Sequence, residues 1–419
     1  MTSPLISDAA VQTANTLDLA DPLAHCRDRF SLPEGVIYLD GNSLGALPKG
    51  VNERLHRAIN EEWGVGLIRS WNDADWYPAP QRVGAKIAAL IGANAREVIS
   101  CDSTTVNLFK VLCASMEANP TRDTIVCEEG NFPTDAYITE RAAKLYGKRV
   151  LLANQDTIEA VIAEAGDRLC TVALTHVHYK TGRMLDMQRV TALTHAVGGR
   201  IIWDLAHTAG VVPVQLHAWN VDYAVGCGYK YLNGGPGAPA YVYVREDLIA
   251  ALDQPLAGWH GHAAPFSFEQ GYRAHPTIDR LLVGTASQLA VISLEAALAA
   301  FDGVSMLDVR KKSESLTGLF IAQFDAQLAQ FGFELVTPRD AARRGSQVSF
   351  THPDGYAIMQ AVIARGVIGD FRAPNILRFG FAPLYLSHRD IVNAITIIAD
   401  VMHAGEWKRA EFSQKKAVT

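Results

Sequence analysis

The feature that most limits the fold is a regular alternation between residues 95 and 245, where short apolar runs are followed by stretches with helical spacing. Runs rich in Val, Ile and Leu predict buried strands, and the intervening helices let successive strands lie parallel. The predicted strands are 97–100, 124–127, 150–152, 171–175, 200–203, 224–227 and 240–244. This succession predicts an α/β fold with a mostly parallel central sheet and right-handed crossovers.

Two domains are expected because 419 residues exceed what one compact core usually organises. We assign residues 1–35 to an N-terminal arm and 36–300 to a large domain, whose N-terminal part can pack with the small domain. Residues 301–419 form a smaller α+β domain. Its predicted elements are helices 304–331, 356–364 and 390–402 and half-buried strands 347–350 and 376–379, with a fraying polar end at 404–419.

The central chemical feature is an apolar run that ends in Asp204, with His207 three residues later. Further along, Lys230 lies between two tyrosines just before a glycine-rich turn. A lysine that can form a Schiff base and a carboxylate that can pair with a pyridinium nitrogen are what pyridoxal phosphate (PLP) requires. These residues therefore predict a PLP site near the carboxyl ends of the parallel strands, where such sheets bind ligands.

Hydroxyl residues 103–105 stand where a predicted strand gives way to a helix, so they can cap that helix or bind a phosphate at its N-terminus. Capping is the commoner role, but a PLP lysine elsewhere favours the phosphate.

Asp135 can likewise cap a helix that begins near residue 136. Trp71 can plug a neighbouring core or form the wall of an aromatic pocket. Arg378, inside a strand, can pair with an acid or bind a substrate carboxylate through two parallel hydrogen bonds.

Taken in order and spacing, these motifs resemble those of bacterial kynureninases, which are PLP enzymes of the aspartate-aminotransferase fold (fold type I). The resemblance runs from about residue 36 to 402. The segments that carry it are 38–45, 68–71, 107–110, 131–135, 203–207, 229–237 and Arg378.

The resemblance implies that Lys230 forms the Schiff base, that Asp204 pairs with the pyridinium nitrogen with Asp135 beside it, and that Phe132 stacks on the ring. The further cofactor contacts that it implies are Thr104, Thr105, Thr175, His207 and Tyr229. Trp259 and Thr285 match residues that reach the phosphate from a partner subunit, which implies a homodimer with shared active sites. Ser43, Trp71 and Arg378 match the substrate pocket.

The implied reaction is hydrolytic Cβ–Cγ cleavage of L-kynurenine, or its 3-hydroxy form, to anthranilate or 3-hydroxyanthranilate and L-alanine in tryptophan catabolism. Lys230 would move the α-proton, and either Tyr229 or a proton linked to the cofactor phosphate would serve as an acid or base. The chain departs from the bacterial pattern at four places, which are 72–77, His178, His260 and 284–287.

Other enzymes with the same cofactor remain open. An aminotransferase or a β-lyase acting on a related 4-oxo or aromatic amino acid needs little beyond Lys230, Asp204 and Arg378. A cysteine desulfurase is disfavoured because it requires a nucleophilic cysteine downstream of the lysine, and no cysteine follows Cys227. A non-enzymatic PLP-binding protein would be expected to lack the lysine.

Composition excludes several other classes. A net charge of −6 without a basic stripe argues against nucleic-acid binding. No apolar run approaches the ~20 residues of a membrane span, and the first 20 residues lack the pattern of a secretory signal. The six cysteines form no CxxC pair, so neither a metal site nor a disulfide framework is indicated. A cytoplasmic enzyme acting on a small-molecule amino acid is expected.

Overall fold

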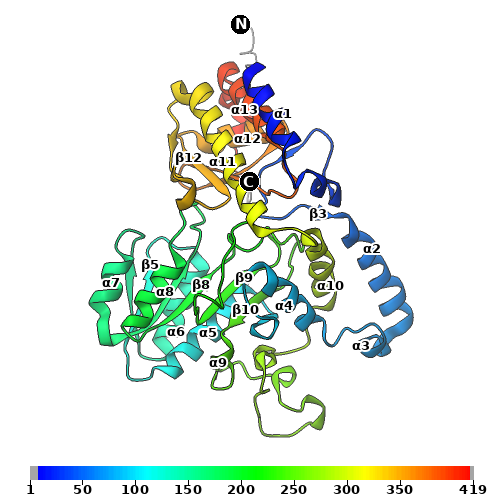
Figure 1. The fold of residues 1–419 in the computed structure, drawn as a ribbon, viewed down its shortest axis with the longest axis vertical. Helices are drawn as coiled ribbons and strands as arrows, with labels where there is room; N and C mark the ends of the chain where they lie inside the picture. The colour runs from blue at the N-terminus through cyan, green and yellow to red at the C-terminus, as the bar shows by residue number, and fades with distance from the viewer. Residues whose placement is uncertain (1–7, 416–419) are drawn as a thin grey trace.

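The computed structural model describes residues 8–415 and is built around a seven-stranded sheet (Figure 1). Its strand order is β4-β10-β9-β8-β7-β5-β6. The strands are β4 (Val98–Ser100), β5 (Thr124–Glu128), β6 (Arg149–Ala153), β7 (Leu169–Thr175), β8 (Arg200–Asp204), β9 (Tyr223–Cys227) and β10 (Ala240–Val244). The five strands from β9 to β6 pair in parallel, and β10 is antiparallel to both of its neighbours. The predicted α/β fold and its seven strands are confirmed.

The central sheet separates two hydrophobic cores. Along β8, Ile201 and Trp203 pack into one cluster, whereas Ile202 packs into the other. This alternation follows from the two-residue period of a strand, and both faces are apolar because helices cover each of them. The helices of this region are α4 (Ala79–Leu90), α5 (Thr104–Ala118), α6 (Pro133–Leu145), α7 (Ile158–Ala165), α8 (Met187–Ala196), α9 (Glu246–Ile249) and α10 (Gln288–Ala297).

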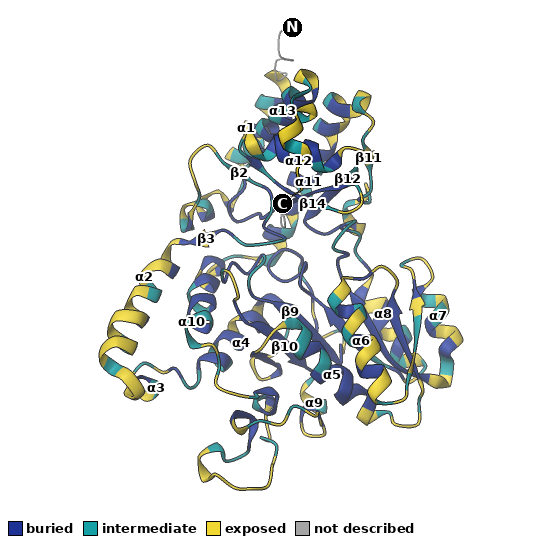
Figure 2. Cartoon of the chain, turned by 180° about the vertical axis from the view of Figure 1, so that it is seen from behind, coloured by how far each residue is buried: buried dark blue, intermediate teal, exposed yellow. Residues whose placement is uncertain are grey.

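Apolar residues recur at helical spacing in the segment after residue 48, at Val51, Leu55, Ile59 and Trp63, but the segment is more irregular than this pattern predicts. Helix α2 (Lys49–Arg57) continues as a π-helix over Ala58–Gly66, then as a 3₁₀ turn over Leu67–Arg69 and α3 (Ser70–Asp73). Figure 2 shows α2 largely exposed, in contrast to the buried strands of the central sheet. The side chains of Trp63, Val65 and Ile68 are exposed as well.

The C-terminal part forms a second, antiparallel sheet with the order β11-β12-β15-β14. Its strands are β11 (Glu334–Leu335), β12 (Gln347–Thr351), β14 (Asp370–Arg372) and β15 (Ile376–Gly380), and its helices are α11 (Met306–Leu328), α12 (Gly355–Ala364) and α13 (His388–Ala404). Phenylalanine rings join the layers: Phe324 of α11 stacks on Phe350 of β12 at 3.7 Å between ring centroids. This agrees with the expected α+β arrangement of the last hundred residues.

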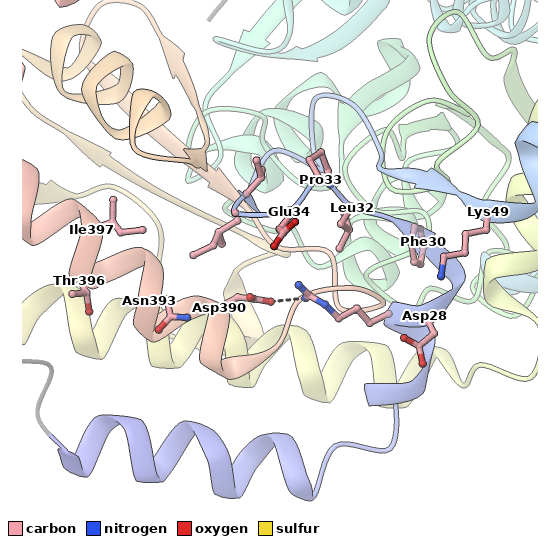
Figure 3. A pocket seen from close by; sticks show the side chains of 14 residues that line it. Asp28, Phe30, Leu32, Pro33, Glu34, Lys49, Asp390, Asn393, Thr396 and Ile397 are labelled. Carbon is pink, nitrogen blue, oxygen red and sulfur yellow. Dashed lines mark hydrogen bonds and ion pairs between the residues drawn. The ribbon is translucent and has the colours of Figure 1, made fainter.

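N-terminal segments pack against the small sheet and its helices. Helix α1 (Asp8–Leu19) lies beside α13 (Figure 1). Strand β2 (Ile37–Tyr38) pairs in parallel with β13 (Val367–Ile368), and β1 (Phe30–Ser31) pairs with β3 (Leu47–Pro48). Between the arm and α13 lies an open hollow of about 680 Å³, across which Arg27 forms an ion pair with Asp390 at 2.6 Å (Figure 3).

Side-chain contacts fix both the start of helix α13 and the segment that follows it. Helix α13 begins with the capping box that its sequence indicates, because Ser387 Oγ accepts from the Asp390 amide (3.1 Å) and Asp390 accepts from the Ser387 amide (2.9 Å). The expectation that residues 404–419 fray is wrong for the two 3₁₀ turns at Glu406–Lys408 and Ala410–Ser413. Trp407 and Phe412 pack there against the main core.

Within residues 8–415, no single helix has the length and apolar character needed to cross a bilayer. Only the pair Gln288–Phe301 and Met306–Phe331, bent by 81°, meets these two criteria jointly. The described residues contain no group of three or more side chains suited to hold a metal ion. All six cysteines are free and buried.

Candidate active site

A cavity of about 380 Å³ lies at the carboxyl ends of the parallel strands, where open α/β sheets place their ligands. Nine residues predicted from the sequence line it together: Thr104, Thr105, Phe132, Asp135, Thr175, Asp204, His207, Tyr229 and Lys230. They come from five strand-to-helix or strand-to-loop junctions that are up to 126 residues apart in the sequence, from Thr104 to Lys230. The central sheet therefore assembles in space what the sequence presents as separate motifs.

Two buried carboxyl groups, those of Asp204 and Asp135, line the cavity. Asp204 ends β8, and its Oδ1 accepts from the Ala206 amide at 2.7 Å. Asp135 lies in the first turn of α6, which begins at Pro133, so the alternative that Asp135 caps a helix beginning near residue 136 is wrong.

Burial raises the pKa of both carboxyls, and the charge of Asp204 raises that of Asp135 further. The Lys230 ammonium and the contact with Asp135 act in the opposite direction on Asp204. The pKa of Asp135 is therefore raised further than that of Asp204, so Asp135 is the member of the pair that keeps a proton more readily and Asp204 is the one better suited to face a protonated ring nitrogen as a carboxylate.

Lys230 follows β9 and reaches the centre of the cavity. Its Nζ lies 3.0 Å from His207 Nε2, 5.8 Å from the centroid of the Phe132 ring and 5.9 Å from that of Tyr229. Burial, and then the Lys230 charge, lower the pKa of His207 well below its usual value, so the imidazole is neutral and its Nε2 accepts from the ammonium. Burial raises the pKa of the Tyr229 phenol well above its ordinary value, so Tyr229 keeps its proton.

The segment that carries Lys230 is held by the loop at residues 40–45. The Gly45 amide donates to Tyr229 O at 2.8 Å. A Cβ on Gly45 would lie 2.3 Å from Lys230 O and 2.6 Å from the Asn233 Cα, so only glycine allows this approach. Gly45 therefore packs directly against the backbone of the lysine segment.

Hydroxyl groups line the end of the cavity next to α5. Ser103 caps this helix, since its Oγ accepts from the Val106 amide at 3.4 Å. Thr104 and Thr105 form the first turn and line the cavity, where the free amides of a helix N-terminus favour an anion. Capping and the predicted phosphate contacts thus fall to different residues of the same segment.

The cavity fits PLP on the chemistry of its lining. Among the described residues, the buried Nδ1 of His207 has no hydrogen-bond partner. An amine nucleophile at Lys230, a carboxylate at Asp204 and a hydroxyl-lined helix terminus are the groups that would hold the aldehyde, ring nitrogen and phosphate.

Five predicted residues lie outside this cavity in the single chain. Arg378, on β15, is 2% exposed, and its Nε donates to Asp370 Oδ1 at 2.7 Å while its Nη2 donates to Asp370 Oδ2. Its Nη1 donates to Tyr179 O at 2.8 Å, and its Nη2 also donates to the Ser43 hydroxyl at 2.8 Å. Ser43 and Arg378 are therefore brought together, but around Asp370, and the alternative that Arg378 pairs with an acid describes this structure.

The other three lie further along the surface. Trp71 packs edge-on against Trp76 at 5.9 Å, which matches the reading of Trp71 as a plug. Trp259 is 44% exposed and stacks on His260 at 4.9 Å, and Thr285 is exposed.

Three of the four departures from the bacterial pattern meet in one aromatic cluster. The ring of Tyr77 lies 5.0 Å from that of His260, and His260 Nδ1 lies 3.3 Å from Gly284 O. The fourth, His178, is buried at the edge of the loop after β7, with its Nε2 3.1 Å from Gly130 O. The three clustered positions thus form one packing unit next to Trp259.

Sequence reasoning missed several residues around the site. Tyr179 lines the cavity and meets Phe132 edge-on at 5.2 Å, and Asp102 lines it beside Ser103. Asp370 and Arg372, a short hairpin away from Arg378, complete the buried ionic cluster. Tyr179 lies in the loop four residues after the end of β7, and neither its position nor that of Asp370 was marked by a local pattern.

The chain is similar in sequence to kynureninases over nearly its whole length. The family model described as kynureninase C-terminal domain matches residues 309–398. The kynureninase of Pseudomonas fluorescens is 47% identical over 407 residues, covering 96% of this chain and 98% of the relative. That of Burkholderia pseudomallei is 45% identical over 412 residues, covering 97% and 99%.

Solved structures show the same fold at lower identity. The cysteine desulfurase CsdA of Escherichia coli has a TM-score of 0.74 at 21% identity, covering 91% of this chain and 98% of that one. A C-DES variant with glycine covalently linked to its PLP cofactor has a TM-score of 0.78 at 18% identity, covering 89% and 99%.

Proposed function

This chain belongs to the kynureninase family, and from that premise we propose how its cavity acts as the active site. The protein is a PLP-dependent hydrolase that cleaves the Cβ–Cγ bond of kynurenine, giving anthranilate and L-alanine. The observation that carries the site assignment is the convergence of Lys230, His207 and the Asp204–Asp135 pair in one cavity. Hydrolysis of the 3-hydroxy form is a finer part of the same proposal.

The cofactor would be held by groups at three sides of the cavity. Lys230 Nζ would bind its aldehyde carbon, Asp204 its ring nitrogen, and Thr104 and Thr105 its phosphate. Phe132 would cover one face of the ring, and Thr175 and Tyr229 would complete its contacts. When bound, PLP supplies an electron-accepting ring that stabilises negative charge next to the substrate amine.

Two side chains, Lys230 and Tyr229, move protons, and a third, His207, positions one of them. Lys230 Nζ, once free, takes the proton from the substrate α-carbon and returns protons later in the cycle. His207 Nε2, neutral and 3.0 Å away, holds this amine in position by accepting one of its hydrogens. Tyr229, which keeps its proton, can donate it to the substrate carbonyl oxygen as water adds there.

We assign the substrate carboxylate to Arg378, with Ser43 beside it and Trp71 near the aromatic end of the substrate. In the described structure, the Arg378 donors serve Asp370, Ser43 and Tyr179 O, so the substrate carboxylate would have to share or replace one of these acceptors. Two arginines, Arg378 and Arg372, pair with the carboxylate of Asp370. The nearby Asp40 has a pKa raised to about 7, so it adds less than a full negative charge at neutral pH, which supports an excess of positive charge there.

A product assay tests the reaction. Purified protein with PLP should convert L-kynurenine to equal amounts of anthranilate and alanine without an added oxo acid. Turnover that depends on an oxo-acid acceptor would instead identify an aminotransferase. Lys230→Ala should reduce turnover by about a thousandfold or more, because it removes the group that moves the α-proton.

The homodimer belongs to this proposal. Trp259 and Thr285 are exposed and lie outside the cavity of their own chain, which is consistent with a role in the cavity of a second copy. Exposed apolar side chains at Trp63, Ile68 and Phe268 offer surface for such an interface.

Mixing two inactive variants tests whether active sites are shared. Lys230→Ala damages its own site, and Trp259→Ala would damage the partner's. In mixed dimers both defects then fall in one site and leave the other intact, so a 1:1 mixture should recover about a quarter of wild-type activity. No recovery, despite demonstrated exchange of subunits, would mean that Trp259 acts within its own chain.

The same proposal covers domains and location. We take 36–300 as the cofactor-binding domain, 301–419 as the small domain and 1–35 as an arm. A cytoplasmic location is supported by six free thiols, which persist in a reducing compartment. Cell fractionation with an antibody against the native protein tests it.

A further inference from the structure

Lys110 is a buried cation that has no part in the chemistry described above. It lies in α5 with a fully buried side chain. Its Nζ donates to Asp102 Oδ2 at 2.5 Å, to Leu281 O at 2.6 Å and to Asn107 Oδ1 at 3.4 Å. The thiol of Cys101 lies 3.9 Å from the same Nζ, so the three ammonium hydrogens meet three oxygen acceptors and one weak sulfur acceptor. Because burying an ammonium is costly, such complete pairing indicates a defined structural task.

Asp102, the ionic partner, is part of the cavity wall. It directly precedes the hydroxyl residues 103–105, and its backbone has a φ of +47°. The Asp102 carbonyl accepts from the Ala240 amide at 2.9 Å, which fixes this residue against β10. An unpaired carboxylate at this point would repel a phosphate at the N-terminus of α5.

The carbonyl oxygen of Leu281, which also accepts from the Lys110 ammonium, belongs to another segment of the chain. It ends the 3₁₀ turn Ile278–Leu281, and the chain runs on from there to Thr285. The same ammonium therefore joins the start of α5 to the segment that carries Thr285.

We propose that Lys110 and Asp102 are a positioning pair for the phosphate end of the cofactor site. Lys110 neutralises the Asp102 carboxylate and holds the segment at 102–105 against the segment at 278–285. The inference rests on the proposed placement of the PLP phosphate at Thr104 and Thr105. It predicts that the pair acts on the phosphate, and only weakly on the rest of the cofactor.

Equilibrium binding to the apoenzyme tests this directly. Affinity for PLP and for pyridoxal, which lacks the phosphate, is measured by quenching of protein fluorescence. In Lys110→Met, Asp102 loses its counter-charge, so PLP should bind about tenfold more weakly or worse, while pyridoxal binding changes little. An equal loss for both compounds would overturn the proposal.

A second substitution separates charge from packing. Adding Asp102→Asn to Lys110→Met removes the exposed negative charge and should restore most of the PLP affinity. Asp102→Asn alone keeps the ammonium and should bind PLP at least as tightly as the wild type. If the double variant stays as weak as Lys110→Met, or if Asp102→Asn alone weakens PLP, charge shielding is wrong.

Lys312 offers a matched control. It forms another buried ion pair, with Asp21 at 2.6 Å, and both side chains are at most 5% exposed. Lys312→Met should lower the melting temperature without changing the ratio of PLP to pyridoxal affinity. A wild-type protein that binds neither compound would contradict the proposed function itself, which keeps that failure distinct from a failure of the Lys110 proposal.

Discussion

At the scale of single residues, replacing each of the two buried aspartates of the cavity, Asp204 and Asp135, by asparagine should have different consequences. Asp204→Asn should lower kcat/KM for kynurenine about a hundredfold or more, because an amide carries no charge with which to stabilise a protonated ring nitrogen. Burial and the Asp204 charge raise the pKa of Asp135 further than that of Asp204, so Asp135→Asn replaces the group that more readily stays neutral and should cost less than about tenfold.

Steady-state kinetics at saturating PLP, with the absorbance spectrum of each holoenzyme as a check on cofactor binding, distinguishes the two variants. Equal losses would show that the proton is not localised on Asp135. Asp204→Glu is a useful control, because it keeps the charge and tests only its position.

How much of the site a sequence reveals depends on how local its signals are. Asp204, His207 and Lys230 were predictable because each follows a strand at a spacing that carries chemical meaning. That Arg378 pairs with an acid was one of the two predicted roles, but the acid itself was not predictable, because Asp370 is brought to Arg378 by the pairing of β14 with β15. Tyr179 enters the cavity through the course of a loop, which no periodicity describes.

At the scale of elements, Asp222, which directly precedes β9, joins three others. It is fully buried and accepts from His195 Nε2 (2.7 Å), Arg200 Nη1 (2.8 Å) and the Ile201 amide (3.0 Å), and it also pairs with Arg245 at 3.1 Å. These side chains come from α8, β8 and the end of β10. Asp222→Asn leaves buried donors without their charge and should cost about 3 kcal/mol of stability.

The pH dependence of this loss follows from the pKa of Asp222. Burial alone would raise it, but the hydrogen bond and charge of His195, with Arg200, outweigh burial and lower the pKa below its ordinary value. A carboxyl with a lowered pKa contributes stability above its unfolded pKa of about 3.9, and that contribution disappears as pH falls through the folded pKa. Urea unfolding should therefore show a gap between wild type and Asp222→Asn that is full at pH 7 and narrows below roughly pH 4.

The elements that could be predicted from the sequence were the strands buried on both faces of the sheet. Strands such as β7 and β9 are buried at every position, so a continuous apolar run identifies them. The two-residue strands β1, β3, β11 and β13 were missed because their pairing comes from tertiary contacts and not from any local pattern. Similarly, helical spacing up to Trp63 could not indicate that the helix widens into a π-helix after Arg57.

At the scale of the whole molecule, the loop at residues 40–45 connects both sheets. The Gly380 amide of the small sheet donates to Leu39 O at 2.7 Å, and Gly45 contacts the Lys230 segment of the large one. Within this loop Asp40 faces Asp370. Burial, and then the Asp370 charge, raise the pKa of Asp40 to about 7, although Arg378 opposes this shift.

A raised carboxyl pKa makes the folded state bind more protons than the unfolded state between about pH 4 and 7. Stability is therefore lost as pH rises through this window, and the penalty is complete above the folded pKa. Asp40→Asn removes the charge, so it should stabilise the protein by on the order of 2 kcal/mol at pH 8 and by little near pH 4. Thermal unfolding across this pH range measures the difference.

Asp370→Asn, in the same cluster, should instead destabilise the protein at pH 8. Burial would raise the pKa of Asp370, but its contact with Arg378 outweighs burial and lowers it. Its charge thus stabilises the fold at neutral pH, and its loss, which leaves Arg378 buried without a counter-charge, should cost about 3 kcal/mol. Two aspartates in one cluster would then respond to the same substitution with opposite signs at pH 8. Destabilisation by both variants at pH 8 would mean that the charge of Asp40 stabilises the folded protein, so that the pKa of Asp40 is not raised.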